Sequence, residues 1–244
     1  MIFSRFDFVD DVAIAADSKA LFFGGAQDMD IGYDGTDGYL RTDLVAASDL
    51  NVDCGANKTL ELQTTVWKDI NLGAGVLSLP VATQPDEVEI DDEAGAGTGI
   101  YTWGFAVNEL VSGVFEVQHD YAEGTDVTFH VHWGANDAPS GTDYVKWELT
   151  YSIVRDDNTI NAVTVLPVET GYDTQYEWVR SDFAAIVGST GGVDGGNILI
   201  GDQFFFKLKR IAAVGDAYAG DALVATLGMH YQVDTMGSRQ IATK

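Results

Sequence analysis

Period-two alternation of apolar and polar side chains is the feature that most constrains the fold of this chain. It runs through residues 127–133, 145–153 and 223–234. Because successive side chains of a strand point to opposite faces, each of these segments predicts a half-buried strand. Further apolar segments lie at 115–118, 160–168, 198–200 and 203–211. Roughly seven or eight strands without a convincing helix predict an all-β fold, an antiparallel β-sandwich or jelly roll.

The N-terminal part has a different pattern, in which very short apolar segments are separated by turn residues. Asp34-Gly35 and Asp37-Gly38 favour tight turns, since glycine accepts a positive φ without steric cost. The predicted hairpin strands of about three to five residues bury too little apolar surface to be stable alone. We therefore expect this region to pack against copies of itself in other subunits, rather than against a larger sheet of its own chain.

These patterns predict three parts of the chain. Residues 1–71 are expected to form a short β-hairpin region for anchoring and oligomerisation. Residues 72–99 hold Pro80, Pro85, an acidic run and several glycines, which indicates a linker or long surface loop. Residues 100–244 are expected to form the jelly-roll-like sandwich.

The charge balance limits the classes of partner. The chain has 13 Lys and Arg against 38 Asp and Glu, a formal net charge of −25. Such a surface repels phosphate backbones and anionic membranes, so nucleic acid is not an expected partner. No apolar run reaches the roughly 18 residues that span a bilayer, and the acidic start does not resemble an export signal. The acidic residues are scattered along the chain and repel one another. We therefore expect that salt, as in a saline habitat, or surface-bound divalent cations relieve this repulsion.

Catalytic motifs are not found in the sequence. There is no Walker pattern, no G-x-S-x-G and no H-E-x-x-H, and the glycines of 95–99 lack dinucleotide-binding spacing. A single cysteine, Cys54, offers neither a disulfide nor a thiol pair for zinc. Carboxylates are too abundant for any pair to be selected as a glycosidase site. We therefore expect no enzyme, no catalytic residues and no cofactor, with a divalent cation left open.

Histidine is the one scarce residue type in a suggestive position. His130 and His132 share one face of a predicted strand, so their rings would stand within about 7 Å of each other. They would hold a metal ion if His230, Asp126 or Asp234 supplied a third ligand. The alternative is that these rings are hydrogen-bonded on a polar sheet face or at a subunit contact.

Three other features have a structural and a functional interpretation. Acidic turns at Asp28, Asp30, Asp34 and Asp37 do not match the calcium-loop spacing. Trp133 and Trp147 are expected in the core, whereas Trp67, Trp103 and Trp178 are open candidates for sugar stacking. The basic patch within 204–210 fits either a strand with a polar face or a subunit contact.

Two segments resemble a family of structural proteins of tailed bacteriophages and related archaeal viruses. Residues 115–133 contain an H-x-Y-x-E-G-T-D turn followed by an H-x-H-W strand, and residues 229–240 read MHYQVDTMGSRQ. Residues 19–24, followed by Asp28 and residues 31–36, resemble the short β repeats that lead into such domains. The resemblance implies a virion component, a β-rich homotrimer exposed on a capsid or tail in contact with other capsid or tail proteins. It implies a turret, head-fibre, decoration or tail role and supplies no catalytic residues.

Two other functional classes remain. A host-receptor or carbohydrate-binding module would present aromatic side chains from loops to a host surface glycan. A polysaccharide hydrolase on a jelly-roll scaffold would use a metal ion held by His130 and His132.

Overall fold

The computed structural model describes residues 19–23, 29–33, 38–41, 61–215 and 217–238 of the 244-residue chain. The chain divides into two compact units, Met1–Ala56 and Asn57–Lys244. Cys54 and the acidic positions 28, 34 and 37 lie outside the described residues, so their predicted roles stay predictions. No helix in the described part is long and apolar enough to cross a membrane.

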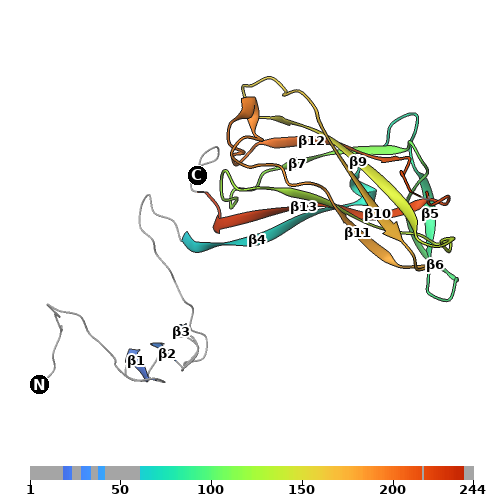
Figure 1. Cartoon of the computed structure of the whole chain (residues 1–244). Helices are drawn as coiled ribbons and strands as arrows, with labels where there is room; N and C mark the ends of the chain where they lie inside the picture. Colours follow the sequence, from blue (N-terminus) through green and yellow to red (C-terminus); the bar gives the residue numbers. More distant parts are fainter. Residues whose placement is uncertain (1–18, 24–28, 34–37, 42–60, 216, 239–244) are drawn as a thin grey trace, which may run out of the picture. The chain divides into compact units, whose positions relative to one another are not determined.

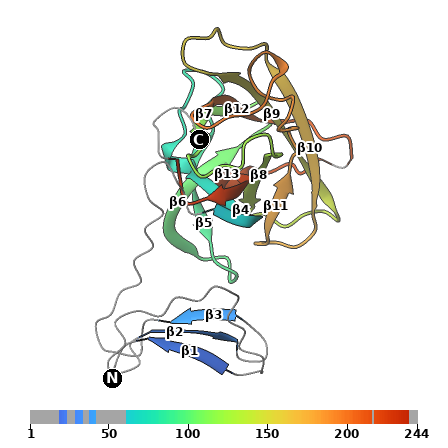
Figure 2. The same ribbon diagram turned by 90° about the vertical axis from the view of Figure 1, so that its left-hand side faces the viewer.

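The first unit contains a three-stranded antiparallel sheet, seen with its strands side by side in Figure 2. Its strands are β1 (Lys19–Phe23), β2 (Met29–Tyr33) and β3 (Gly38–Arg41), in the order β1-β2-β3. The predicted short hairpins are therefore confirmed for these residues. Ile31 stands opposite Leu21 on one side and Leu40 on the other.

The second unit is made of strands and two single 3-10 turns. Its elements in chain order are β4 (Glu61–Gly73), η1 (Ala74–Val76), β5 (Asp86–Asp91), β6 (Gly97–Phe105), β7 (Leu110–Glu116), β8 (Thr128–Gly134), β9 (Asp143–Val154), β10 (Thr164–Tyr172), β11 (Trp178–Asp182), η2 (Val193–Gly195), β12 (Gln203–Ile211) and β13 (Ala222–Thr235). All strand pairs of the two sheets are antiparallel.

The predicted antiparallel β-sandwich is confirmed, and its strand order is that of a jelly roll. One sheet has the order β10-β9-β12-β7, and the other has the order β11-β8-β13-β6-β5. From β6 to β13, every connection between consecutive strands crosses to the opposite sheet, except the one between β9 and β10. Each layer therefore holds four of these eight strands. β4 and β5 enlarge the second layer, where β4 pairs with β13 beside the end of β6.

The core lies between the two layers, which face each other in Figure 1. Phe129 of β8 contacts Phe115 and Phe204 of the opposite sheet, with ring centroids 5.4 and 5.6 Å apart. Trp133 and Trp147 are fully buried, as predicted, with centroids 6.4 Å apart. These edge-to-face contacts across the layers make the sandwich a self-sufficient hydrophobic unit.

Two arginines link the sandwich through polar contacts. Arg155 donates from Nε and Nη2 to the carboxylate of Asp202, which is fully buried, at 2.6 and 2.9 Å. The buried guanidinium of Arg210 donates to the carbonyls of Phe105, Tyr218 and Gly220. The basic patch expected around Arg210 is therefore part of strand β12, and its arginine satisfies backbone groups inside the fold.

The predicted domain boundaries differ from the structure. All of 61–71 lies in β4, which pairs with β13, so these residues belong to the sandwich and not to the hairpin region. The expected linker over 72–99 also contains β5 and the start of β6, which pair with each other. The acidic run 86–91 forms a strand because it lies at the edge of the sheet, where its carboxylates reach solvent.

Candidate functional site

Three strands of the larger sheet bring histidine and aspartate together on its outer face. Gly228 of β13 stands opposite His130 of β8 and opposite Asn71 of β4. Two residues further along β13, His230 stands opposite Asp69 of β4. Because residues two apart on a strand point to the same face, His130 is a diagonal neighbour of His230 and lies on the same face as His230 and Asp69.

The ligand-type atoms of these three side chains converge. All lie within 4.8 Å of one another. Asp69 Oδ2 is 3.6 Å from Nε2 of His130 and 3.4 Å from Nε2 of His230. The two imidazole rings are stacked, with centroids 4.3 Å apart and planes 27° apart.

His130 is the unusual member of this cluster, because its side chain is fully buried on a polar face. Neither of its ring nitrogens has a hydrogen-bond partner. Burial lowers the pKa of His130 to about 4, despite the opposite effect of the Asp69 carboxylate, so the ring is neutral at pH 7. A buried neutral imidazole without a hydrogen bond is energetically costly unless another group uses its lone pair.

Gly228 makes room for this ring. A Cβ atom at position 228 would lie 2.4 Å from Cε1 and Nε2 of His130 and 2.5 Å from Oδ1 of Asn71. No side chain larger than hydrogen fits there while the ring keeps its place. The His130 ring therefore lies directly over the backbone of the central strand.

Neighbouring polar groups surround the cluster. Asn71 donates from Nδ2 to Oδ2 of Asp69 at 2.8 Å and so orients that carboxylate. The ring of His132 is perpendicular to that of His130, with centroids 5.0 Å apart. Asp182 of β11 stands opposite His130 and pairs with Arg180 at 3.0 Å.

The structure brings together two of the three histidines proposed as ligands, His130 and His230. His132 lies beside them but outside the group whose ligand atoms converge. Of the other proposed ligands, Asp126 accepts a hydrogen bond from the backbone N–H of Gly188, and Asp234 lies four residues beyond His230 on β13. Sequence reasoning missed Asp69, because only the pairing register of β4 with β13 identifies it.

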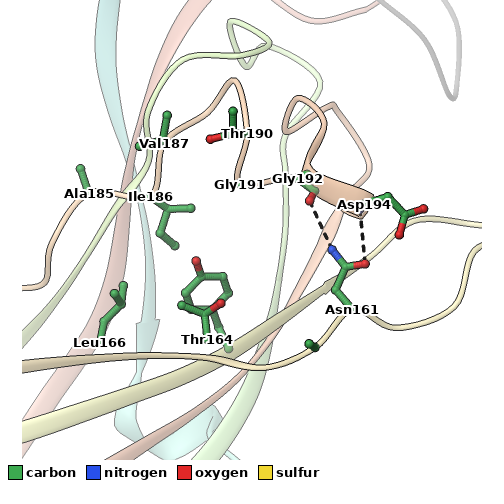
Figure 3. A pocket seen from close by; sticks show the side chains of 13 residues that line it. Asn161, Thr164, Leu166, Ala185, Ile186, Val187, Thr190, Gly191, Gly192 and Asp194 are labelled. Atoms are coloured by element: carbon green, nitrogen blue, oxygen red, sulfur yellow. Dashed lines mark hydrogen bonds between the residues drawn. The ribbon is translucent and has the colours of Figure 1, made fainter.

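A hollow separate from this cluster lies between the β9–β10 region and the 185–195 loop (Figure 3). It has a volume of about 550 Å³, and Asn161 lines it with hydrogen bonds to the carbonyl of Gly192 and the N–H of Asp194. Asp194 is the single carboxylate among its lining residues, which include no histidine, lysine or arginine. The hollow therefore offers one carboxylate and the phenol of Tyr151, but no pair of carboxylates.

Comparisons with known proteins assign no family. No family model and no curated protein matches the chain. Dimeric latent PorU from Porphyromonas gingivalis is a structural match with 10% identity and a TM-score of 0.31; the match covers 75% of this chain and 14% of PorU. The infectious bursal disease virus Gx strain structure matches with 8% identity and a TM-score of 0.28, over 88% of this chain and 69% of the other. At TM-scores this low, neither similarity bears on function.

Proposed function

We propose that this chain is a structural component of a tailed-virus virion, an oligomeric protein exposed on the capsid or tail and not an enzyme. A homotrimer fixed to other capsid or tail proteins through its N-terminal unit is the expected form. A turret, a head fibre, a decoration protein and a tail protein all fit this description.

The observation that carries the proposal is the apolar row of the N-terminal sheet. Ile31 and Leu40 stand directly opposite each other on strands of five and four residues, and they are 47% and 43% exposed. Three such short strands bury too little surface to compensate for the loss of chain entropy. Covering this row with the same row of sister copies would supply the missing burial.

Two further features support the proposal. The jelly roll is an architecture used repeatedly by viral capsid domains, an analogy at the level of the fold. The segments that resemble the phage structural family include the turn before β8 and strands β8 and β13, which form the centre of the larger sheet.

A glycan-binding role is less well supported by the aromatic side chains. Trp67 and Trp178 are 58% and 43% exposed, whereas Trp103 donates its ring N–H to the carbonyl of Ala74. Through their strand partners, Trp67 and Trp178 align with β13 positions 232 and 223, which are nine residues and about 30 Å apart. They do not form one stacking platform.

Mass measurement in solution tests the assembly part of the proposal. The full-length chain should sediment as a trimer at micromolar concentration, and Ile31→Asp with Leu40→Asp should convert it to a monomer. Val81→Asp, at a fully exposed position of the sandwich, is the matched control and should leave the trimer intact. A monomeric wild-type chain would refute the proposed assembly.

Localisation in the particle tests the virion part. Image reconstruction of purified virions should show density for the jelly roll at symmetry-related positions on the capsid or tail. Absence of the chain from purified particles would overturn the assignment, and turnover of a polysaccharide by purified protein would favour the hydrolase class instead.

A further inference from the structure

We infer that Asp69, His130 and His230 form a binding site for a divalent first-row transition cation, with Zn²⁺ as the representative ion. The site would link three adjacent strands, β4, β8 and β13, through one ligand from each. This inference does not depend on the virion role.

The spacing of the ligand atoms fits a tetrahedral ion. Zn²⁺ binds imidazole nitrogen and carboxylate oxygen at about 2.0 Å, which places tetrahedral ligands about 3.3 Å apart. The distances of 3.4 and 3.6 Å from Asp69 Oδ2 to the two histidine nitrogens are close to this value. The remaining pair, one nitrogen from each histidine, lies within 4.8 Å on rings that are stacked 4.3 Å apart, so binding an ion requires the two rings to adjust.

The chemistry of the donors selects the class of ion. Two imidazoles with one carboxylate suit zinc and its transition-metal neighbours, whereas calcium and magnesium prefer oxygen ligands alone. Three protein ligands would leave a fourth position for water. Surface carboxylates elsewhere on this acidic chain offer oxygen only, which distinguishes this cluster from the general negative charge.

The surroundings have the character of a built site. His130 is fully buried with two unpartnered ring nitrogens, and a metal bond would give one of them, Nε2, a partner. Gly228 leaves space for its ring, and Asn71 orients the Asp69 carboxylate as outer-shell partners of metal ligands commonly do. Asp69 and His230 are 32% and 31% exposed, which gives an ion a route of entry.

A bound ion would hold β4 in the larger sheet. This strand is paired with β13, and it is the sandwich strand nearest in the chain to the N-terminal unit. An ion shared by three strands would hold β4 in the sheet when load is applied through the preceding chain.

Zinc titration of the full-length protein after EDTA treatment and dialysis tests the inference. Calorimetry should give one specific Zn²⁺ per chain, and the melting temperature should rise with Zn²⁺ concentration. Asp69→Asn and His230→Gln keep side-chain volume at partly exposed positions, and each should weaken Zn²⁺ binding at least tenfold. His119→Gln removes a histidine outside the cluster and should leave binding unchanged. In addition, Co²⁺ should give the visible spectrum of a four-coordinate ion, which the two ligand variants lose.

Two glycine substitutions distinguish binding at this site from adventitious binding, and neither of them removes a proposed ligand. Gly228→Ala should displace the His130 ring and weaken Zn²⁺ binding, whereas Gly73→Ala, with open space around its Cβ, should not. Zinc binding with unchanged stoichiometry and affinity in Asp69→Asn and His230→Gln would overturn the inference. So would the absence of binding to the wild-type chain at micromolar Zn²⁺.

Discussion

The two units of this protein solve the problem of burying apolar side chains in opposite ways. The sandwich encloses Phe129, Trp133 and Trp147 completely between its two layers. The N-terminal sheet, by contrast, leaves Ile31 and Leu40 nearly half exposed on strands of four or five residues. The sandwich therefore has a core of its own, whereas a partner surface for the N-terminal sheet is part of the proposed assembly.

Removal of the N-terminal unit should have the largest effect. A chain starting at residue 57 keeps every strand of the sandwich, including β4, and should melt at the same temperature as the full-length protein. Self-association should be abolished, as measured by analytical ultracentrifugation. Trimers of the truncated chain would show that the sandwich itself makes the assembly contact.

A core truncation should destabilise the sandwich strongly without affecting association directly. Phe129→Ala removes contacts with Phe115, Phe204 and Phe206, and it should cost about 3–5 kcal/mol of unfolding free energy. Phe205→Ala, on the opposite, exposed face of β12, is the matched control and should cost well under half as much in chemical denaturation. Equal losses would contradict the two-layer core.

The buried ion pair should contribute more than an exposed pair in the same unit. Asp202→Ala removes the carboxylate that accepts from Arg155 and from the N–H of Leu199, and should cost about 2–3 kcal/mol. Asp182→Ala removes the partner of the half-exposed Arg180 and should change stability by less than about 1 kcal/mol. Both are measured by denaturant unfolding in EDTA; similar values would mean that solvent screens both pairs alike.

Salt should have the smallest effect, acting on association. Residues 1–56 carry eleven aspartates against three basic residues, so sister copies of the N-terminal unit repel one another. Raising NaCl shortens the Debye length to about 8 Å at 0.15 M and should tighten self-association modestly. Sedimentation across an NaCl series measures this, and weaker association in salt would indicate that charge pairs hold the copies together.

The sandwich was predictable because its strands carry a strong local signal. Alternation in 127–133 and 145–153 corresponds to β8 and β9, with the apolar set buried as expected. β4 was missed because its inward-facing side chains are not all apolar. Ile70 and Leu72 pack against the core, but Lys68 on the same face forms an ion pair with Asp120 and interrupts the apolar pattern. β5 was missed because its acidic composition resembles a loop, although an edge strand tolerates it.

The candidate metal site was predictable only in part. Two histidines on one strand face are visible in the sequence, and their ring centroids are indeed 5.0 Å apart. His130 lies 61 residues after Asp69 and 100 residues before His230. Their side chains come together only through the pairing register of β4, β8 and β13, and no local sequence pattern specifies that register. The requirement for glycine at position 228 likewise cannot be predicted until His130 is known to stand opposite it.

The position of β13 has a consequence for biosynthesis. Three strands that are translated earlier, β4, β6 and β8, all pair with it. On the ribosome these three remain without their shared neighbour until residue 235 has left the exit tunnel, whereas β9 and β10 can already form their hairpin. Completion of the larger sheet is therefore a late event in the life of the nascent polypeptide, and until then the edges of these strands are open to pairing with other chains.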